Sequence, residues 1–312
     1  MDKQVLQSNG KKGEQGKKSG RRFELPFFFF ILPSLLIIIP IVAFPTAWVF
    51  WLSFQNWNFL SSATPTFNGV NNYGDFLFGY NSAEFLGKIL PATASFVIGA
   101  AALEFLLGLG LAYLADMHLK GEKYFRTAFV IPVFMSGISI GFLYTYIYEP
   151  SNGILNQTLR GSGLGLLASN WHTALSSALP TAIITDAWQW TPFMFLIILA
   201  GMKALPRPVV EAAEVDGATA LYRFRRVILP LLSPIIIIAL LFRLLDLFNY
   251  LTVLYILYPS GGPGQALEII SYFALLLGNR SFYLGQAATI AVFLLIITNV
   301  LAFYLIRRGK FA

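Results

Sequence analysis

The amino-acid sequence predicts an all-α, polytopic membrane protein with six transmembrane helices. Composition is the first observation: of 312 residues, 56% are hydrophobic and only 12% are charged, with a mean hydropathy of +0.66. Soluble domains carry about a quarter charged residues, so this chain belongs among integral membrane proteins. The second observation is a series of six apolar runs, each close to the roughly 20 residues that cross a bilayer.

These apolar runs set the order of the expected elements. We expect spans at 27–52, 89–114, 127–148, 174–202, 230–257 and 287–306. Pro132 in the third run and Pro180 and Pro192 in the fourth predict kinks rather than breaks, because neighbouring helices can satisfy the freed backbone groups. The loops near 56–86, 149–173 and 259–284 are too small to form separate folded domains.

The placement of the basic residues predicts the orientation. All but four of the 22 Lys and Arg residues lie in residues 1–22, in 120–126, in 203–226 or after position 306. The positive-inside rule then places both termini in the cytosol. We expect a disordered basic cytosolic tail at 1–22, the first helix and an external loop at 23–86, and a core domain at 87–310. The charge of +7 is thereby explained without nucleic acid.

The segment 203–229, between the fourth and fifth runs, is longer than a turn requires. Pro206 and Pro208 suit the first turn of a helix, and Gly217 suits its C-cap or a bend. We expect a second short helix over 219–228, ending before Pro230 because the residue preceding a proline disfavours α geometry. Taken alone, these residues fit either a docking element for a cytosolic partner or an amphipathic interfacial helix with basic anchors.

The motif in this segment resembles that of a known family. Glu211-Ala212-Ala213, then Gly217, then Val227-Ile228-Leu229-Pro230 is similar to the cytoplasmic motif of binding-protein-dependent ABC importer permeases. The resemblance covers most of 24–310 and includes Trp188–Phe193 and Gly261-Gly262-Pro263. It points to the carbohydrate class, and within it to the first permease of a two-permease pair of the maltose, trehalose and glycerol-phosphate type.

The resemblance implies a fold, partners and a set of coupling residues. The fold is the type I ABC importer transmembrane domain, in which segment 203–229 is the coupling loop that docks on an ATPase subunit. The coupling residues would be Glu211, Ala212, Ala213, Asp216, Gly217, Leu229 and Pro230. The partners would be a second homologous permease, two ABC ATPase subunits, an extracytoplasmic sugar-binding protein and membrane lipid.

On this interpretation the chain itself performs no catalysis. It would lie in the cytoplasmic (inner) membrane of a bacterium or archaeon and move a di- or oligosaccharide, such as an α-glucoside or trehalose-like sugar, by alternating access. The sequence contains no Gly-rich loop ending in Lys and Ser or Thr, so a partner would bind the ATP and Mg²⁺. We expect neither a cofactor nor a metal in this chain.

Four charged residues fall inside the predicted spans, where charges usually face a cavity or a partner: Glu104, Asp186, Arg243 and Asp246. At 1.5 Å per residue, Asp186 and Arg243 come to comparable depths on neighbouring helices. They could form an ion pair that joins the helices, and Arg243 could also pair with Asp246, three residues on.

The functional alternative is a sugar cavity. Asp186, Gln189, Trp190 and Phe193 share one helical face, and a carboxylate, an amide and two rings suit a sugar's hydroxyls and C–H faces. In the resembling permeases the matching positions line the sugar cavity. The expected cavity residues are Val133, Gly137, Asp186, Gln189, Trp190, Phe193, Phe242, Arg243 and Asp246.

Two other function classes are weighed against this one. A proton-coupled secondary transporter would use Glu104 and Asp186, but no inverted repeat of three helices is detectable. Glu104 is better explained by a hydrogen bond to a neighbouring helix. A membrane-embedded enzyme is disfavoured because His118 and His172 would lie on opposite sides of the membrane and the chain has no Cys.

Overall fold

The structure, a computed structural model, describes residues 24–117 and 122–309. The predicted basic tail at 1–22 and His118 lie outside the described residues. The chain divides into two units, Met1–Trp48 and Val49–Ala312. The described part of the first unit is helical and belongs to α1 (Glu24–Ser53), which runs without interruption through Pro33, Pro40 and Pro45.

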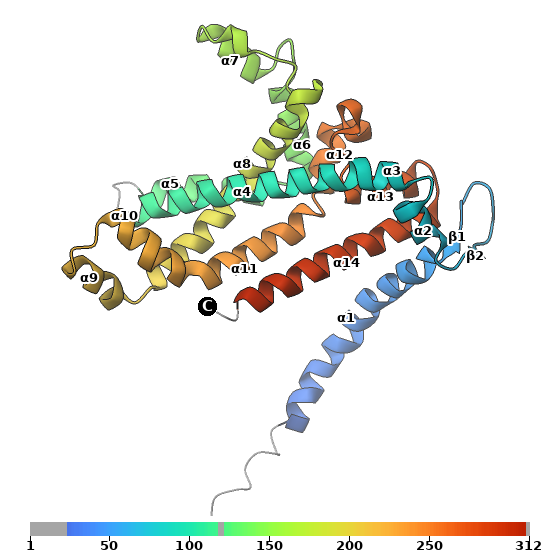
Figure 1. Cartoon of the computed structure of the whole chain (residues 1–312), viewed down its shortest axis with the longest axis horizontal. Helices are drawn as coiled ribbons and strands as arrows, with labels where there is room; N and C mark the ends of the chain where they lie inside the picture. The colour runs from blue at the N-terminus through green and yellow to red at the C-terminus, as the bar shows by residue number, and fades with distance from the viewer. Residues whose placement is uncertain (1–23, 118–121, 310–312) are drawn as a thin grey trace, which may run out of the picture. The chain divides into compact units, whose positions relative to one another are not determined.

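The second unit is helical apart from one small hairpin (Figure 1). Its strands, β1 (Gln55–Asn56) and β2 (Thr66–Phe67), pair antiparallel with Gln55 opposite Phe67. The helices are α2 (Asn71–Phe78), α3 (Ser82–Glu84), α4 (Leu90–Asp116), α5 (Glu122–Phe129), α6 (Gly137–Ile147), α7 (Ile154–Gly161), α8 (Leu175–Ala204), α9 (Arg207–Val215), α10 (Ala220–Arg223), α11 (Leu229–Leu247), α12 (Leu251–Leu257), α13 (Ile270–Asn279) and α14 (Leu284–Gly309).

The described helices agree with the predicted number of spans. Five helical segments are long and apolar enough to cross a membrane: Phe30–Ser53, Ser82–Asp116, Leu175–Ala204, Ala220–Leu247 and Leu284–Gly309. A sixth span results when Arg126–Phe134 and Gly137–Ile147, which meet at a bend of 104°, are taken together. As predicted, α8 is not broken at Pro180 or Pro192.

The third span is broken rather than kinked, which corrects the prediction made from Pro132. A short 3₁₀ turn covers Ile131–Phe134, and the backbone then becomes extended at Met135 (ψ 139°) and Ser136 (ψ 139°) before α6 begins. Proline removes one backbone donor, and the tighter 3₁₀ turn leads the chain out of the α-helix instead of bending it.

The fifth predicted run, 230–257, is also two helices. It separates into α11 and α12 at Phe248–Tyr250, where Tyr250 has ψ 63°. The second pieces of the two broken spans, α6 and α12, pack against one another. A Cβ at Gly141 of α6 would lie 2.8 Å from the Cβ of Ile256 in α12, so only glycine allows this approach.

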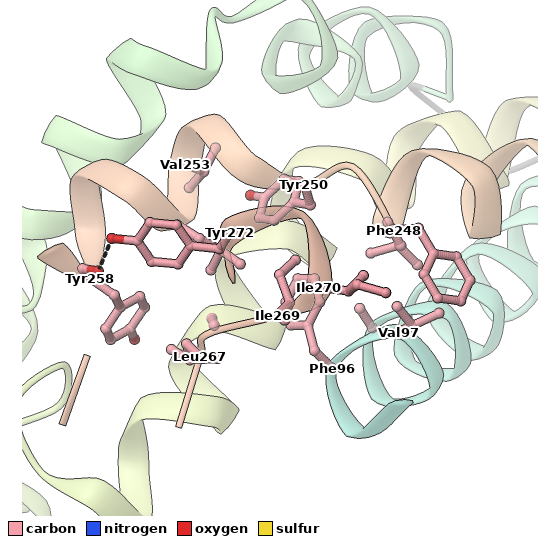
Figure 2. Close-up of a cluster of buried hydrophobic side chains, with 14 of the residues drawn as sticks. Phe96, Val97, Phe248, Tyr250, Val253, Tyr258, Leu267, Ile269, Ile270 and Tyr272 are labelled. Atoms are coloured by element: carbon pink, nitrogen blue, oxygen red, sulfur yellow. Dashed lines mark hydrogen bonds between the residues drawn. The ribbon is translucent and has the colours of Figure 1, made fainter. Parts of the chain in front are cut away.

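Two clusters of buried apolar side chains hold the second unit together. One contains Met194, Phe195 and Leu232, where α8 meets α11 and α4. The other includes the residues of Figure 2, where the ring of Tyr250 stacks on that of Phe96 with centroids 5.6 Å apart and Tyr272 lies beside Tyr258. The hydroxyl of Tyr272 donates to the backbone oxygen of Tyr258 at 3.0 Å.

Candidate functional site: a helical connector and a buried ion cluster

The connector between α8 and α11 contains α9 and α10, at the end of α8 far from α7 (Figure 1). α9 begins directly after Pro206, with Pro208 in its first turn, as predicted. It ends in a Schellman motif: the N–H of Gly217 donates to the oxygen of Glu214, and that of Ala218 to the oxygen of Ala213, both at 3.0 Å. Gly217 has φ +79°, which favours glycine, so its predicted role as a C-cap is confirmed.

The connector presents apolar side chains outward. Val215 is 87% exposed, and Leu221 and Tyr222 are each 59% exposed. Most of the predicted coupling residues lie on the same connector: Glu211, Ala212, Asp216 and Gly217 are exposed and Ala213 is half-buried, while Leu229 is half-buried and Pro230 exposed where α11 begins. An exposed apolar surface of this kind, surrounded by charged residues, is typical of a contact site.

Side-chain contacts fix the connector to the helices beside it. Arg223 of α10 forms an ion pair with Glu214 of α9, with 2.5 Å between Nη1 and Oε1. The ring of Phe224 meets that of Tyr113 in α4 edge to face, with centroids 4.8 Å apart. These contacts hold α10 against α9 and hold the connector against α4.

The prediction of a separate second helix ending before Pro230 is wrong. Leu229 is helical (φ −62°, ψ −42°), and a π-helical turn at Phe224–Ile228 joins α10 to α11. The wider turn leaves room for the ring of Pro230 without breaking the helix. One continuous helix, Ala220–Leu247, consequently runs from the connector into the bundle.

Arg243 of α11 lies at the centre of a buried ion cluster. Its Nε donates to Glu104 Oε2 at 2.5 Å and its Nη2 to Glu104 Oε1 at 2.8 Å. The same Nη2 donates to Asp186 Oδ2 at 2.9 Å, and Nη1 donates to Asp246. Glu104, Asp186 and Arg243 are at most 1% exposed, whereas the Asp246 side chain is 47% exposed.

The cluster shows how the four charged residues within the predicted spans are paired. Glu104 does bond to a neighbouring helix, and Arg243 does pair with both Asp186 and Asp246. The charges join α4, α8 and α11 inside the bundle. Contact of a sugar with Asp186 or Arg243 stays a prediction, and it requires the cluster to open.

The remaining predicted cavity residues lie around the cluster and the break in the third span. The Trp190 ring faces Arg243, 4.7 Å from Cζ to the ring centroid, and Phe193 packs edge-on against Trp190. Gln189 donates to the oxygen of Met135, in the break itself, at 3.4 Å. Its own Oε1 is buried without a hydrogen-bond partner among the described residues.

Val133 and Gly137 stand on either side of this break, and both are half-buried. Phe242 is 59% exposed on α11. The structure therefore brings Gln189, Trp190, Val133 and Gly137 to one region and places Asp246 at the edge of the ion cluster.

Tyr250 is a residue of the site that sequence reasoning missed. Its hydroxyl is buried without a hydrogen-bond partner among the described residues, and its ring stacks on that of Phe96 with centroids 5.6 Å apart. It lies in the segment that separates α11 from α12 (Figure 2). A tyrosine in an apolar run gives no signal of this position. In the described part of the chain, no three His, Cys, Asp or Glu side chains are placed so that they could hold a metal ion.

Comparison with known proteins agrees with these observations. Residues 122–309 match the family described as "Binding-protein-dependent transport system inner membrane component". The chain is 33% identical over 285 residues to the trehalose/maltose transport system permease protein MalF of Thermococcus litoralis, covering 91% of this chain and 93% of that protein. It is 30% identical over 280 residues to the trehalose transport system permease protein SugA of Mycobacterium tuberculosis, covering 90% of this chain and 87% of that one.

A solved structure shares the fold. The crystal structure of a bacterial ABC transporter involved in the import of the acidic polysaccharide alginate matches with a TM-score of 0.75 at 21% identity, over 92% of this chain and 96% of that one. The chain belongs to the family of inner membrane components of binding-protein-dependent transport systems, and its fold is that of a type I ABC importer transmembrane domain.

Proposed function

We propose that this chain is a permease subunit of an ATP-driven, binding-protein-dependent importer whose substrate is a di- or oligosaccharide such as an α-glucoside. The substrate class is supported by relatives named for trehalose, for trehalose and maltose, and for starch degradation products. The chain would not catalyse a reaction. It would move the sugar across the membrane by alternating between two conformations.

The observation that carries this proposal is the connector. It is held in shape by the Gly217 cap and the Glu214–Arg223 ion pair, yet it leaves Val215 and Tyr222 exposed. Because Ala220–Leu247 is one continuous helix, displacement of the connector would move α11 and the Arg243 cluster with it. Through this arrangement, movement of a separate ATPase subunit bound to the connector would be transmitted to α11.

The broken spans supply the place for a sugar. The backbone is unwound at Met135–Ser136 and at Phe248–Tyr250, and irregular backbone within a membrane is tolerated where it lines a cavity or is buried in protein. Gln189 Oε1 and the Asp246 carboxylate would accept hydrogen bonds from sugar hydroxyls, and the Trp190 and Phe193 rings would pack against C–H faces.

The proposal includes the partners and the orientation. Two ABC ATPase subunits would bind ATP and Mg²⁺, a second homologous permease would complete the pathway, and an extracytoplasmic sugar-binding protein would deliver the substrate. A solved alginate transporter with this fold was crystallised with its periplasmic protein carrying an alginate pentasaccharide. Both termini and the connector would face the cytosol.

Two glycines provide a matched test. Gly217 in the connector and Gly163 after α7 both have φ +79° and open space where a Cβ would stand, so alanine causes similar strain at each. We expect Gly217→Ala to abolish ATP-driven uptake of maltose and trehalose, while Gly163→Ala retains it and both variants insert normally. Unchanged uptake in Gly217→Ala would refute the coupling role, and uptake that persists without ATP would refute the ATP-driven mechanism.

A further inference from the structure

We propose that the Arg243 cluster is a charge filter, which makes the pathway accept neutral polyhydroxyl solutes and reject anionic ones. Asp246 is the group that meets the solute, and Glu104 and Asp186 are positioning residues that act through Arg243. This inference rests on the proposed function, because it assumes that a sugar passes along this surface of α11.

The first step is that each nitrogen of the buried Arg243 guanidinium already donates to a carboxylate. Nε and Nη2 donate to Glu104, Nη2 also donates to Asp186, and Nη1 donates to Asp246. The guanidinium is 1% exposed and the Trp190 ring lies against it. A carboxylate or phosphate on a solute therefore finds no cation here, although arginine commonly binds such groups.

The second step is the balance of charge. Three carboxylates surround one guanidinium, so the cluster carries a net negative charge. Fixed charges in a poorly polarisable interior interact strongly with ions nearby. Since Asp246 alone among the three acids is exposed, the excess negative charge is presented at its carboxylate.

The third step is the surface on which Asp246 stands. Phe242 and Asp246 are exposed at i and i+4 on one face of α11, and Asn249 is exposed in the turn that follows the helix. A charged face within a span does not lie against acyl chains, so it faces water or protein. A ring beside a carboxylate suits a sugar, and the buried Tyr250, whose hydroxyl has no hydrogen-bond partner among the described residues, follows Asp246 by four residues.

The negative charge of the Asp246 carboxylate determines which solutes are favoured. Hydroxyl groups of a neutral sugar donate to the Asp246 carboxylate, and such charge-assisted hydrogen bonds are stronger than neutral ones. An anionic sugar is repelled by the same group. The shared fold does not impose this preference, because a transporter with this fold imports an acidic polysaccharide.

The test uses the purified complex of both permeases and the ATPase subunits without the binding protein, so that only the membrane pathway selects. Calorimetric titration compares maltose with a disaccharide of the same size that carries one glucuronic acid. We expect the wild type to prefer maltose by about tenfold or more. Asp246→Asn and Glu104→Gln should each reduce the ratio of the affinity for maltose to that for the anionic disaccharide by about tenfold. Glutamine is chosen at position 104 because its side-chain oxygen can still accept a hydrogen bond from Arg243.

Asp116→Asn is the matched control, since it removes the same charge about 18 Å along α4 from Glu104 and should leave the preference unchanged. A preference that persists in both Asp246→Asn and Glu104→Gln overturns the charge filter but not sugar binding. Loss of the second permease from the Asp246→Asn complex also overturns it, because Asp246 would then be an assembly contact. If maltose does not bind the wild type, the proposed function fails as well.

Discussion

Arg243 of α11 grips Glu104 of α4 with two parallel hydrogen bonds, Nε to Oε2 at 2.5 Å and Nη2 to Oε1 at 2.8 Å, at a site that is almost fully buried. This fork fixes the rotation of both helices relative to one another. Asp186 of α8 binds the same Nη2, so three helices depend on one guanidinium.

Removal of that guanidinium alone should be costly. Arg243→Met leaves Glu104 and Asp186 buried without a cation, and we expect a loss of about 3–5 kcal/mol of stability. The triple variant Glu104→Leu, Asp186→Leu, Arg243→Met removes all three charges and should recover most of that loss. Thermal unfolding in detergent measures both variants, and a triple variant less stable than Arg243→Met would contradict this account of the cluster.

The ion pair between Glu214 and Arg223 should matter for coupling more than for stability. Both side chains are partly exposed, so the pair contributes at most about 1 kcal/mol. We expect Arg223→Glu to leave the unfolding temperature nearly unchanged and to lower the sugar transported per ATP hydrolysed. The exchanged pair Glu214→Arg, Arg223→Glu should restore that ratio, and failure of the exchange would show that orientation of α9 by this pair is not needed.

The glycine contact between α6 and α12 predicts a steric effect. Alanine at Gly141 would place its Cβ 2.8 Å from that of Ile256, so Gly141→Ala should destabilise the protein by about 1–3 kcal/mol and reduce uptake. Gly110→Ala in α4 is the control, because nothing lies within 4 Å of its Cβ and alanine favours a helix. Ile256→Gly, which removes the Cβ that alanine at 141 would strike, should restore part of the uptake lost in Gly141→Ala if the two helices pack as described.

The burial of Glu268, between α12 and α13, predicts that the stability of the folded protein depends on pH. Burial, reinforced by the nearby Glu84, raises the pKa of Glu268 from 4.5 to about 7, against the opposing effect of Lys88 and Arg280. The folded state therefore binds this proton more tightly than the unfolded state does. The resulting contribution of protonated Glu268 to the free energy of unfolding is fully present below pH 4.5 and is lost as the pH rises through 7. In Glu268→Gln the unfolding temperature should change less between pH 5 and pH 8 than in the wild type. An equal change in both proteins would contradict a raised pKa of Glu268.

The sequence predicts much of this fold because long apolar runs and glycine caps are local signals. The number of spans and the Gly217 cap follow from composition and spacing alone. Similar depth on neighbouring helices also indicated that Asp186 and Arg243 could meet, and Glu104 was expected to bond another helix. Each of these features depends on residues whose chemistry has few alternatives within a membrane.

The breaks in two spans were not predictable in the same way. Apolar residues continue through Met135 and through Phe248–Tyr250, so hydropathy cannot distinguish a straight helix from a broken one. The continuous helix through Pro230 was missed because the π-helical turn that accommodates it has no composition of its own. The burial of Asp186 depends on packing between three helices, which a single stripe of side chains does not reveal.

The central claim is that the connector between α8 and α11 lies in the cytosol and is held by a separate ATPase subunit. The chain has no Cys, so a single cysteine can be placed at Val215 in the connector or, as a control, at the exposed Leu166 after α7. Crosslinking in native membranes should join Val215→Cys, but not Leu166→Cys, to the ATPase, and a membrane-impermeant thiol reagent should label only Leu166→Cys in cells or spheroplasts. Labelling of Val215→Cys from outside, or crosslinking of Leu166→Cys to the ATPase, would contradict the account.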